Sequence, residues 1–569
     1  MSFTNSPTKR RTIAVGFLAF VLACAVWIGH SHHKKDLPSI PPFSTDQDIG
    51  KVHPALNFRI VSFHRGRADK NLILLARQLG FNGVQFQIEG STVKGVQDFA
   101  DRDAREHLID FCHSLNMQVT LWVHEFSDLP DETDPAFLGP ATTDNAKLWN
   151  VISDRYDWFL TKVVPNIDGL VLTTVETQVN ATNTAVMLKL TNLIDQKCRD
   201  HGKYMIARTF VWHPDELDQV MGAVKQMPAH IPIMSKIVPQ DWQMRGDMAA
   251  ELGAVGEHEQ IVEFDAEGEY FLRDNAANCM VDLLKQQYDY AVARHARGIC
   301  VRVDRDDSSV IFEPQEVNLW TLGLLSAGAT DNTSDIWTAW ANYRYGPRAA
   351  PAVVAALKPT GDVVSEMLSV GPFTYGDTRQ TFSAADPRFF PALPYEDILS
   401  QNWQNWRWNE KYFPALVQAS AGDPAFISQI RASQKTALEK ADACLANLEK
   451  AKPDLPEREY AILHTRLLSN KIQLQFRTAA TLAALDYRAM FSAQTGEQSA
   501  AAREQYLNDL APVQTLAAAL KAFPKPRNFD YLGKTWSVDA PLAITAPAVQ
   551  EWLNEARQLP GPDDADPFP

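Results

Sequence analysis

The sequence predicts an α/β protein, a (β/α)8 TIM barrel followed by a C-terminal α-helical domain. Eight short apolar runs follow one another between residues 56 and 304, and each precedes helical periodicity or a long loop. Near-continuous apolar runs are typical of parallel strands that are buried on both faces. Eight such units in about 275 residues match the size of a closed barrel. A doubly wound open sheet is the alternative, but no glycine-rich phosphate loop follows the first run.

The predicted strands are rich in β-branched and aromatic residues. In chain order they are 56–63 (LNFRIVSF), 82–88 (NGVQFQI), 117–123 (MQVTLWV), 169–175 (GLVLTTV), 203–212 (KYMIARTFVW), 231–238 (IPIMSKIV), 260–265 (QIVEFD) and 298–304 (GICVRVD). The segments between them carry apolar residues at helical spacing, which predicts covering helices. The clearest of these residues are Leu72, Leu75 and Leu79; Leu108, Ile109, Phe111 and Leu115; Trp149, Ile152, Tyr156, Phe159 and Val163; Leu188, Leu190 and Ile194; Leu217, Val220 and Val224; and Met280, Leu283, Leu284, Tyr288 and Val292.

The pattern changes beyond residue 350. Residues 425–525 hold long helix-period segments with few glycines, such as 461–491, and these predict several antiparallel helices. The expected domains are a signal or membrane anchor (1–30), a linker (31–54), the barrel (55–350), the helical domain (351–558) and a flexible tail (559–569).

The N-terminus carries a targeting pattern. Lys9, Arg10 and Arg11 precede an apolar run over 13–29, which predicts an export signal or an uncleaved membrane anchor. The run contains "VLAC", ending at Cys24, which is similar to a bacterial lipoprotein processing site. We therefore expect an exported protein, periplasmic or at the cell surface, whose only membrane contact is this segment. The pattern leaves open whether the segment is cleaved, lipidated or retained, and the sequence does not give the oligomeric state.

Charge and cysteine usage exclude several classes of protein. The chain has 54 basic and 69 acidic residues, a net charge of −15, whereas nucleic-acid binding requires a basic surface. The five cysteines after Cys24 are scattered without a CxxC pair, so we expect buried, inert thiols. His64, His124 and His213 share no ligand spacing. No metal and no organic cofactor are expected.

Polar residues gather where the predicted strands end, and in a barrel of this kind the catalytic groups lie there. In strand order these residues are His64 and Arg65; Glu89; His124 and Glu125; Glu176; Arg208, Trp212 and His213; Lys236, Asp241 and Trp242; Asp265, Glu267 and Glu269; and Asp304 and Arg305. Aromatic faces stack on sugar rings, carboxylates act as acid and base, and cations hold anionic groups. Polar residues surround the mouth of any barrel, so this composition alone does not decide the reaction. One interpretation of Glu263, inside the seventh run, is a structural partner for a strand-end Arg.

Residues 56–346 resemble the catalytic barrel of the α-glucuronidases of glycoside hydrolase family 67. The resemblance rests on "GLVLTTVETQ" around Glu176, "ARTFVWHP" with Arg208, "SKIVPQDWQ" with Lys236 and Asp241, and "EFDAEGEYFL" with Glu269. The spacing from Asp241 to Glu269 equals that between the two candidate base carboxylates of the family. The segment "EVNLWTLGLLSAG…IWTAWANYRYG" is similar to the family's helix beyond the eighth strand.

The resemblance implies an inverting O-glycosyl hydrolase that acts on an oligosaccharide. Glu176 would be the general acid, and Asp241 and Glu269 would activate the water. Arg208, Lys236, Trp242, Trp212, His64 and His124 would bind the substrate. The sequence gives neither the exact sugar nor the linkage.

Two departures from the family bear on this expectation. A family Lys that grips the glucuronate carboxylate is matched by Leu172, and the family's β-rich N-terminal domain is missing. The alternatives are a non-catalytic surface carbohydrate-binding barrel and a barrel lyase or isomerase for acidic sugars. The second alternative would use a Lys or His base and often a metal.

Overall fold

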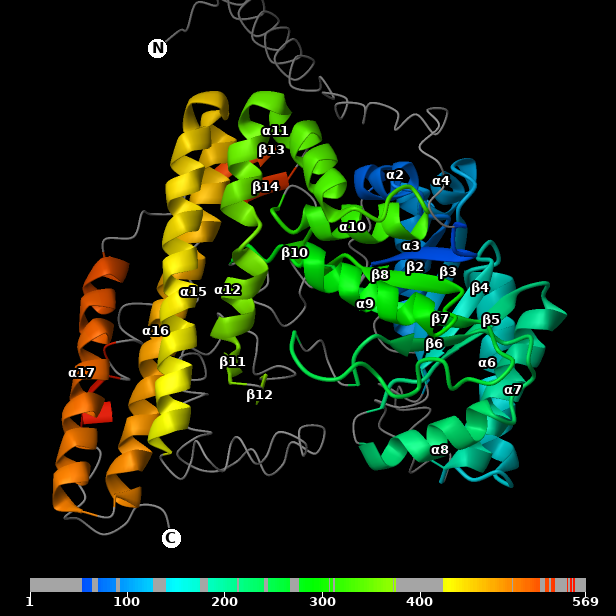
Figure 1. Cartoon of the computed structure of the whole chain (residues 1–569). Coiled ribbons are helices and arrows are strands. Elements are labelled where there is room, and N and C mark those ends of the chain that lie inside the picture. Colours follow the sequence, from blue (N-terminus) through cyan, green and yellow to red (C-terminus); the bar gives the residue numbers. More distant parts are fainter. Residues whose placement is uncertain are drawn as a thin grey trace, which may run out of the picture.

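The computed structural model describes residues 54–63, 70–88, 93–125, 140–173, 183–211, 214–239, 244–266, 276–305, 308–310, 313–371, 373–374, 423–493, 495–521, 528–531 and 534–537, with a few residues between 550 and 557. Figure 1 shows a barrel on one side of the molecule and a stack of long helices on the other.

Eight parallel strands form a closed barrel in sequence order, because β1 pairs with β2 on one side and with β8 on the other. This confirms the predicted fold. The strands are β1 (Phe58–Phe63), β2 (Gly83–Gln87), β3 (Gln118–His124), β4 (Gly169–Thr173), β5 (Tyr204–Arg208), β6 (Ile233–Lys236), β7 (Gln260–Asp265) and β8 (Gly298–Arg302).

Alternate residues of each strand point into the barrel, as the pleat requires. A layer of buried apolar side chains fills its middle. This layer consists of Ile60, Trp122, Val171, Ile206, Met234, Ile261 and Cys300. The residues between them point outward into the much larger core under the helices. The strand register therefore decides which residues can reach the mouth of the barrel.

The amino-terminal end of the barrel is filled by the rings of Phe58 and Tyr204, which pack against the middle layer. Glycines face these two residues. A Cβ atom on Gly298 would collide with the Cβ of Phe58, and one on Gly169 would lie 2.9 Å from the Tyr204 ring. Only glycine leaves room for the aromatic residues at these two positions.

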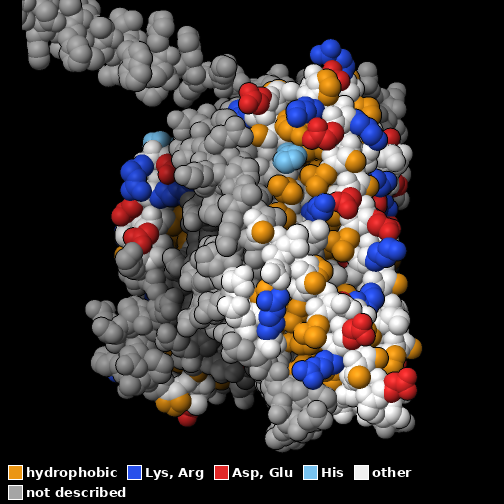
Figure 2. All heavy atoms as spheres, turned by 90° about the vertical axis from the view of Figure 1, so that its left-hand side faces the viewer, with side chains coloured by type: hydrophobic (Ala, Val, Ile, Leu, Met, Phe, Trp, Pro, Cys, Tyr) orange, Lys and Arg blue, Asp and Glu red, His pale blue; other side chains and the backbone are white. Residues whose placement is uncertain are grey.

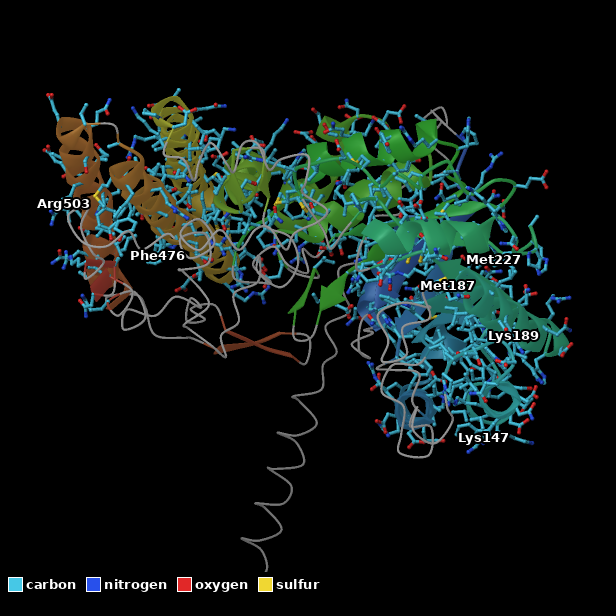
Figure 3. The ribbon with its side chains drawn as sticks, turned by 90° about the horizontal axis from the view of Figure 1, so that it is seen from below. Lys147, Met187, Lys189, Met227, Phe476 and Arg503 are labelled. Atoms are coloured by element: carbon cyan, nitrogen blue, oxygen red, sulfur yellow. The ribbon has the colours of Figure 1, made fainter. Side chains whose placement is uncertain are left out.

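Helices cover the outside of the barrel. They are α2 (Lys70–Gln78), α3 (Val93–Glu106), α4 (Leu108–Ser114), α6 (Ala146–Trp158), α7 (Thr184–Asp200), α8 (Pro214–Val224), α9 (Val281–Ala293) and α10 (Glu316–Ser326). Asn145 caps α6 by accepting a hydrogen bond from the Leu148 amide, and Asn183 caps α7 in the same way. In Figure 3, Met187 of α7 and Met227 after α8 lie between these helices, where Met187 belongs to a buried cluster and the partly buried Met227 packs against it. Lys147 and Lys189 lie at the outer surface.

Helix α3 differs from the sequence prediction. Its residues, VKGVQDFADRDARE, are mostly polar, so few apolar side chains mark its buried face. Val96 and Phe99 are nevertheless buried against the barrel. Between β6 and β7 the described residues form turns, which agrees with the long loop expected there.

The C-terminal region is mainly helical, as predicted. Its helices are α11 (Thr333–Leu357), α12 (Thr360–Met367), α15 (Pro424–Ala451), α16 (Glu457–Ser492) and α17 (Gly496–Lys521). The last three lie side by side and antiparallel (Figure 1). Helix α16 has 36 residues and is about 54 Å long. Phe476, labelled in Figure 3, lies buried between these helices.

Short antiparallel strand pairs accompany the barrel and the helices: β9 (Asp304–Arg305) with β10 (Ser308–Ser309), β11 (Ser369–Val370) with β12 (Phe373–Thr374), and β13 (Asn528–Tyr531) with β14 (Lys534–Ser537).

Two ion pairs join the C-terminal helices to the loops at the mouth of the barrel. Arg466 of α16 donates from Nε and Nη2 to both carboxylate oxygens of Glu313, at 2.9 and 3.0 Å. Arg245, after β6, donates from Nη2 to Glu366 of α12 at 2.5 Å. The outer face of the helices is ordinary protein surface, where Figure 2 shows side chains of both charges interspersed with apolar ones.

No helix in the described part of the chain is long and apolar enough to span a membrane. The predicted export or anchor segment over 13–29 lies outside the described residues. All five cysteines that the structure describes are buried and unpaired, which confirms the expectation for them. Burial raises the pKa of Cys112, Cys198 and Cys279 to about 12, so these thiols stay protonated.

Candidate functional site at the barrel mouth

A layer of buried polar side chains lies above the apolar layer, at the carboxyl end of the strands. Each member except Gln85 stands two or four residues after an inward-facing residue of the layers below, so it points inward too. Gln85 points the same way, because its Nε2 donates to Ser62 Oγ at 2.8 Å. The layer consists of Ser62, Gln85, His124, Thr173, Arg208, Lys236, Glu263, Asp265 and Arg302, and each is at most 9% exposed. Three cations and two carboxylates therefore share a small volume that is shielded from water, where charges interact strongly.

Arg208 and Glu263 form the central ion pair of this layer. The guanidinium donates from Nε to Oε2 at 2.5 Å and from Nη2 to Oε1 at 3.1 Å. Burial raises the pKa of Glu263, but the charges of Arg208, Lys236 and Arg302 outweigh it and hold the pKa below its ordinary value. Glu263 is therefore an anion at neutral pH. This geometry confirms the interpretation of Glu263 as a structural partner for a strand-end Arg.

Aromatic faces support the cations. The Arg208 guanidinium carbon lies 4.5 Å from the Trp122 ring centre, and Arg302 lies over the same ring at 5.6 Å. The Lys236 ammonium lies 4.1 Å from the ring centre of Phe210. Cation–π contacts of this kind strengthen when they are shielded from water. The positions of all three cations are thus fixed by ring faces as well as by charge.

Trp122 also orders the neighbouring strands. Its indole N–H donates to Thr173 Oγ1 at 2.9 Å, and its ring centre lies 5.0 Å from that of His124. His124 is the last residue of β3 and faces the mouth of the barrel, and its role in substrate binding stays a prediction. Ligand pockets commonly combine aromatic side chains with a few hydrogen-bonding groups.

Of the predicted site residues, the structure brings together Arg208, Lys236 and His124. Lys236 pairs in register with Glu263, and His124 with Thr173, which itself pairs with Arg208. The others, Glu176, Asp241, Glu269, Trp242, Trp212 and His64, lie outside the described residues. They remain predictions.

Two positions have a different orientation from the one that the sequence suggested. Glu125, expected at the rim, binds Arg155 at 3.1 Å and the Tyr156 hydroxyl at 2.6 Å, both on α6, and so lies outside the barrel. Leu172 is fully buried in the core under the helices, because odd and even residues of β4 face opposite sides. A side chain at position 172 therefore does not reach the mouth, and the missing Lys says little about how a substrate carboxylate would be held.

Trp122 and Arg302 contribute to the site, but neither was among the site residues predicted from the sequence. The alternation of side chains along a strand could have identified both residues. Counting back by two residues from His124 gives Trp122, and Arg302 lies two before the rim residue Asp304. In the described ranges no group of three or more His, Cys, Asp or Glu side chains is placed to hold a metal ion.

Several solved structures of glycoside hydrolases are similar to this chain. The structure of a GH138 enzyme targeting pectin rhamnogalacturonan II matches with a TM-score of 0.61 at 11% sequence identity, over 89% of this chain and 67% of that chain. A GH20 β-N-acetylhexosaminidase from Streptomyces coelicolor matches with a TM-score of 0.35 at 12% identity, over 52% of this chain and 68% of its own. A family 5 glycoside hydrolase from Prevotella bryantii B14 matches with a TM-score of 0.32 at 10% identity, over 47% and 87%.

The match to the GH138 enzyme, at 11% identity, shows the fold alone. None of the three is a family 67 enzyme. No protein-family model and no curated protein matches the sequence.

Proposed function

We propose that the chain is an exported or membrane-anchored glycoside hydrolase that removes an acidic sugar from an oligosaccharide by cleaving an α-glycosidic bond. The observation that carries the proposal is the layer of cations, carboxylates and aromatic rings at the carboxyl end of the barrel. This is the end at which barrel enzymes carry out their chemistry. The fold shared with the GH138 enzyme supports the proposal, since that enzyme targets a pectic polysaccharide.

The proposed reaction is inverting hydrolysis, as in the α-glucuronidases that the sequence resembles. Glu176 donates its proton to the glycosidic oxygen while the bond from that oxygen to the anomeric carbon breaks. Asp241 and Glu269 orient a water on the opposite face of the ring and accept its proton as the water oxygen bonds to the anomeric carbon. An inverting pair of this kind requires about 6.5–9.5 Å between acid and base.

Lys236 and Arg302 are the proposed partners of the sugar's carboxylate. Arg208 already donates two hydrogen bonds to Glu263. We therefore assign it mainly to neutralising Glu263 and to fixing the Trp122 ring beneath the sugar. Its Nη1 atom is buried and has no hydrogen-bond partner in the described part of the chain, and it is the Arg208 group best suited to a substrate oxygen. Export of the protein is proposed from the apolar run over 13–29 alone.

The test is a screen of aryl and oligosaccharide α-glycosides, with and without a carboxylate on the sugar. We expect turnover of the uronides without added metal, and NMR of the first product should show the inverted anomer. Glu176→Gln should lower kcat by about 1,000-fold, since general acid catalysis contributes 100- to 10,000-fold. Glu259→Gln is the matched control, because Glu259 lies at the opposite end of the barrel and binds Asn57.

Three results would contradict the proposal. Retention at the anomeric carbon would exclude the inverting mechanism, and full activity of Glu176→Gln would remove Glu176 from it. Binding of uronic-acid oligosaccharides without any turnover would instead indicate a carbohydrate-binding barrel.

A further inference from the structure

A buried amide side chain joins the two ends of the segment that connects β7 to α9. Asn318, in the first turn of α10, is fully shielded from solvent. Its Nδ2 donates to the carbonyl oxygens of Ala266 at 2.9 Å and of Asn278 at 3.0 Å, and its Oδ1 accepts from the Met280 amide at 2.7 Å. One side chain thus uses both donors and its acceptor on backbone groups at both ends of the segment.

Two more buried amides reinforce this junction. Gln315, which precedes α10, donates to the Ala276 carbonyl at 3.1 Å. Asn470 of α16 donates to the Ala277 carbonyl at 2.7 Å and accepts from the Ala277 amide at 2.9 Å. Both side chains are 2% exposed. The barrel and the C-terminal helices therefore hold the same stretch of backbone from two sides.

The junction lies next to the polar layer at the mouth. Asp265, which precedes Ala266, belongs to that layer, and the Ala266 amide also donates to the Arg302 carbonyl at 2.9 Å. The chain between Ala266 and Ala276 carries Glu269, one of the two proposed base carboxylates. A displacement of about 1 Å in a catalytic group can cost 100-fold in rate. Asn318 holds the backbone directly after Asp265, so a change of its amide is expected to shift a charged group of the polar layer.

We infer that Asn318 is a positioning residue of the active site, supported by Asn470: by holding the Ala266 carbonyl it fixes the backbone directly after Asp265, and with it this carboxylate of the polar layer. The inference rests on the proposed function. The opposing explanation is that Asn318 only stabilises the fold, as any satisfied buried amide does. The two explanations differ in what happens to kcat when the amide is changed.

The barrel contains a matched control at the other end of the same strand. Gln260, the first residue of β7, is 3% exposed. It donates to Ser235 Oγ at 3.1 Å and to the Glu251 carbonyl at 3.2 Å, and accepts from the Gly253 amide at 2.7 Å. It is therefore a buried amide with the same number of partners as Asn318, but far from the mouth. Its removal should cost stability and leave the chemistry unchanged.

The experiment compares Asn318→Asp, Asn470→Leu and Gln260→Glu with the wild type in the full-length protein. Asn318→Asp keeps the shape but presents a carboxylate oxygen to two carbonyls, and only the protonated form can donate to one of them. We expect kcat to fall about 100-fold with KM within three-fold, and the ratio of variant to wild-type kcat to rise as the pH falls. Asn470→Leu should lower kcat about 10-fold. Gln260→Glu should change kcat less than two-fold at a comparable loss of thermal stability.

Hydrogen exchange provides a readout that needs no activity. Asn318→Asp keeps an acceptor for the Met280 amide but loses the two bonds donated to Ala266 and Asn278, and its carboxylate repels both carbonyls. The backbone at Met280 should therefore loosen, so that exchange of this amide accelerates at least 10-fold, and it should stay unchanged in Gln260→Glu. Equal effects of the Asn318 and Gln260 substitutions on kcat, in an active wild type, would overturn the inference and leave the proposed function intact. A wild type that hydrolyses no glycoside would overturn the proposed function. A positioning role in that reaction would then fall with it, and accelerated Met280 exchange would show only that Asn318 stabilises the fold at this junction.

Discussion

Arg208 and Glu263 form an ion pair that is almost completely removed from water, with exposed side-chain fractions of 2% and 0%. Desolvating both charges is costly, and the bidentate geometry and the two nearby cations offset that cost. The pair is best explained as part of the polar layer: Arg208 lies over the Trp122 ring, and the carboxylate of Glu263 is stabilised by the Lys236 ammonium as well. Removing one partner should therefore be far more harmful than removing a surface charge.

We predict that Glu263→Gln lowers the free energy of unfolding by about 3 kcal/mol, because it leaves Arg208 buried without a counter-ion. Since the pKa of Glu263 is lowered on folding, its stabilising effect is present above its ordinary value of 4.5 and is lost as the pH falls. Urea unfolding of wild type and variant between pH 3 and 7 checks both points. Asp362→Asn, which removes an exposed pair with Lys440, is the control and should lower the free energy of unfolding by less than about 1 kcal/mol. Equal stability of Glu263→Gln and wild type would contradict the prediction.

At the scale of elements, strands were easier to predict than side-chain directions. All eight predicted runs contain a strand, and "QIVEFD" coincides with β7, because β-branched and aromatic residues are concentrated where both faces are covered. The directions of the Glu125 and Leu172 side chains were missed. Side chains alternate between the two faces of a strand, and an apolar run without alternation does not show which residues face inward. Helix α3 was missed because its charge conceals two buried positions. The outward Val292, 39% exposed, shows the reverse error in α9.

Helices α15, α16 and α17 meet at a shared Arg. Arg431 of α15 donates to Asp486 of α16 at 2.6 Å and to Asp509 of α17 at 2.7 and 3.0 Å. Burial and the neighbouring Asp509 raise the pKa of Asp486 to about 8, and Arg431 only partly opposes them. One cation therefore faces two carboxylates, of which one keeps its proton at neutral pH.

We predict that this junction weakens as the pH rises. Between the ordinary pKa of 3.8 and about 8, the folded chain binds a proton on Asp486 that the unfolded chain has lost, so the free energy of unfolding falls with pH. The slope from this group is at most about 1.4 kcal/mol per pH unit. Asp486→Asn should flatten the dependence from pH 5 to 8 in urea unfolding, and Asp442→Asn, which removes an exposed pair with Lys471, should not. A steeper slope in Asp486→Asn would be inconsistent with the raised pKa.

At the scale of the whole molecule, barrel and helices are joined through the mouth of the barrel. Arg466–Glu313 and Arg245–Glu366 link α16 and α12 to the connections after β8 and β6, and Asn470 binds the connection after β7. Sequence patterns predicted the barrel and the C-terminal helices, but not the contacts that join them. The joining residues are isolated polar positions whose partners lie more than 100 residues away in the chain, so no local periodicity reveals them.

We predict one cooperative unfolding transition for barrel and helices together. Arg466→Met leaves Glu313 buried without its partner and should lower the stability of the whole by about 3 kcal/mol. Adding Glu313→Gln to this variant should recover part of the loss, because the uncompensated charge is removed. Scanning calorimetry measures both. Two separate transitions in the wild type would show that the parts unfold independently.

The rings of Phe58 and Tyr204, together with the apolar layer above them, seal the barrel at its amino-terminal end. The eight described strands leave no passage along the axis, so a ligand that reaches the polar layer has to leave by the route through which it arrived. For the proposed hydrolase, the released sugar would have to leave, and the next glycan to enter, through the same opening at the carboxyl end of the barrel. Turnover would then depend on the rate at which the acidic sugar dissociates from the cations that bind it.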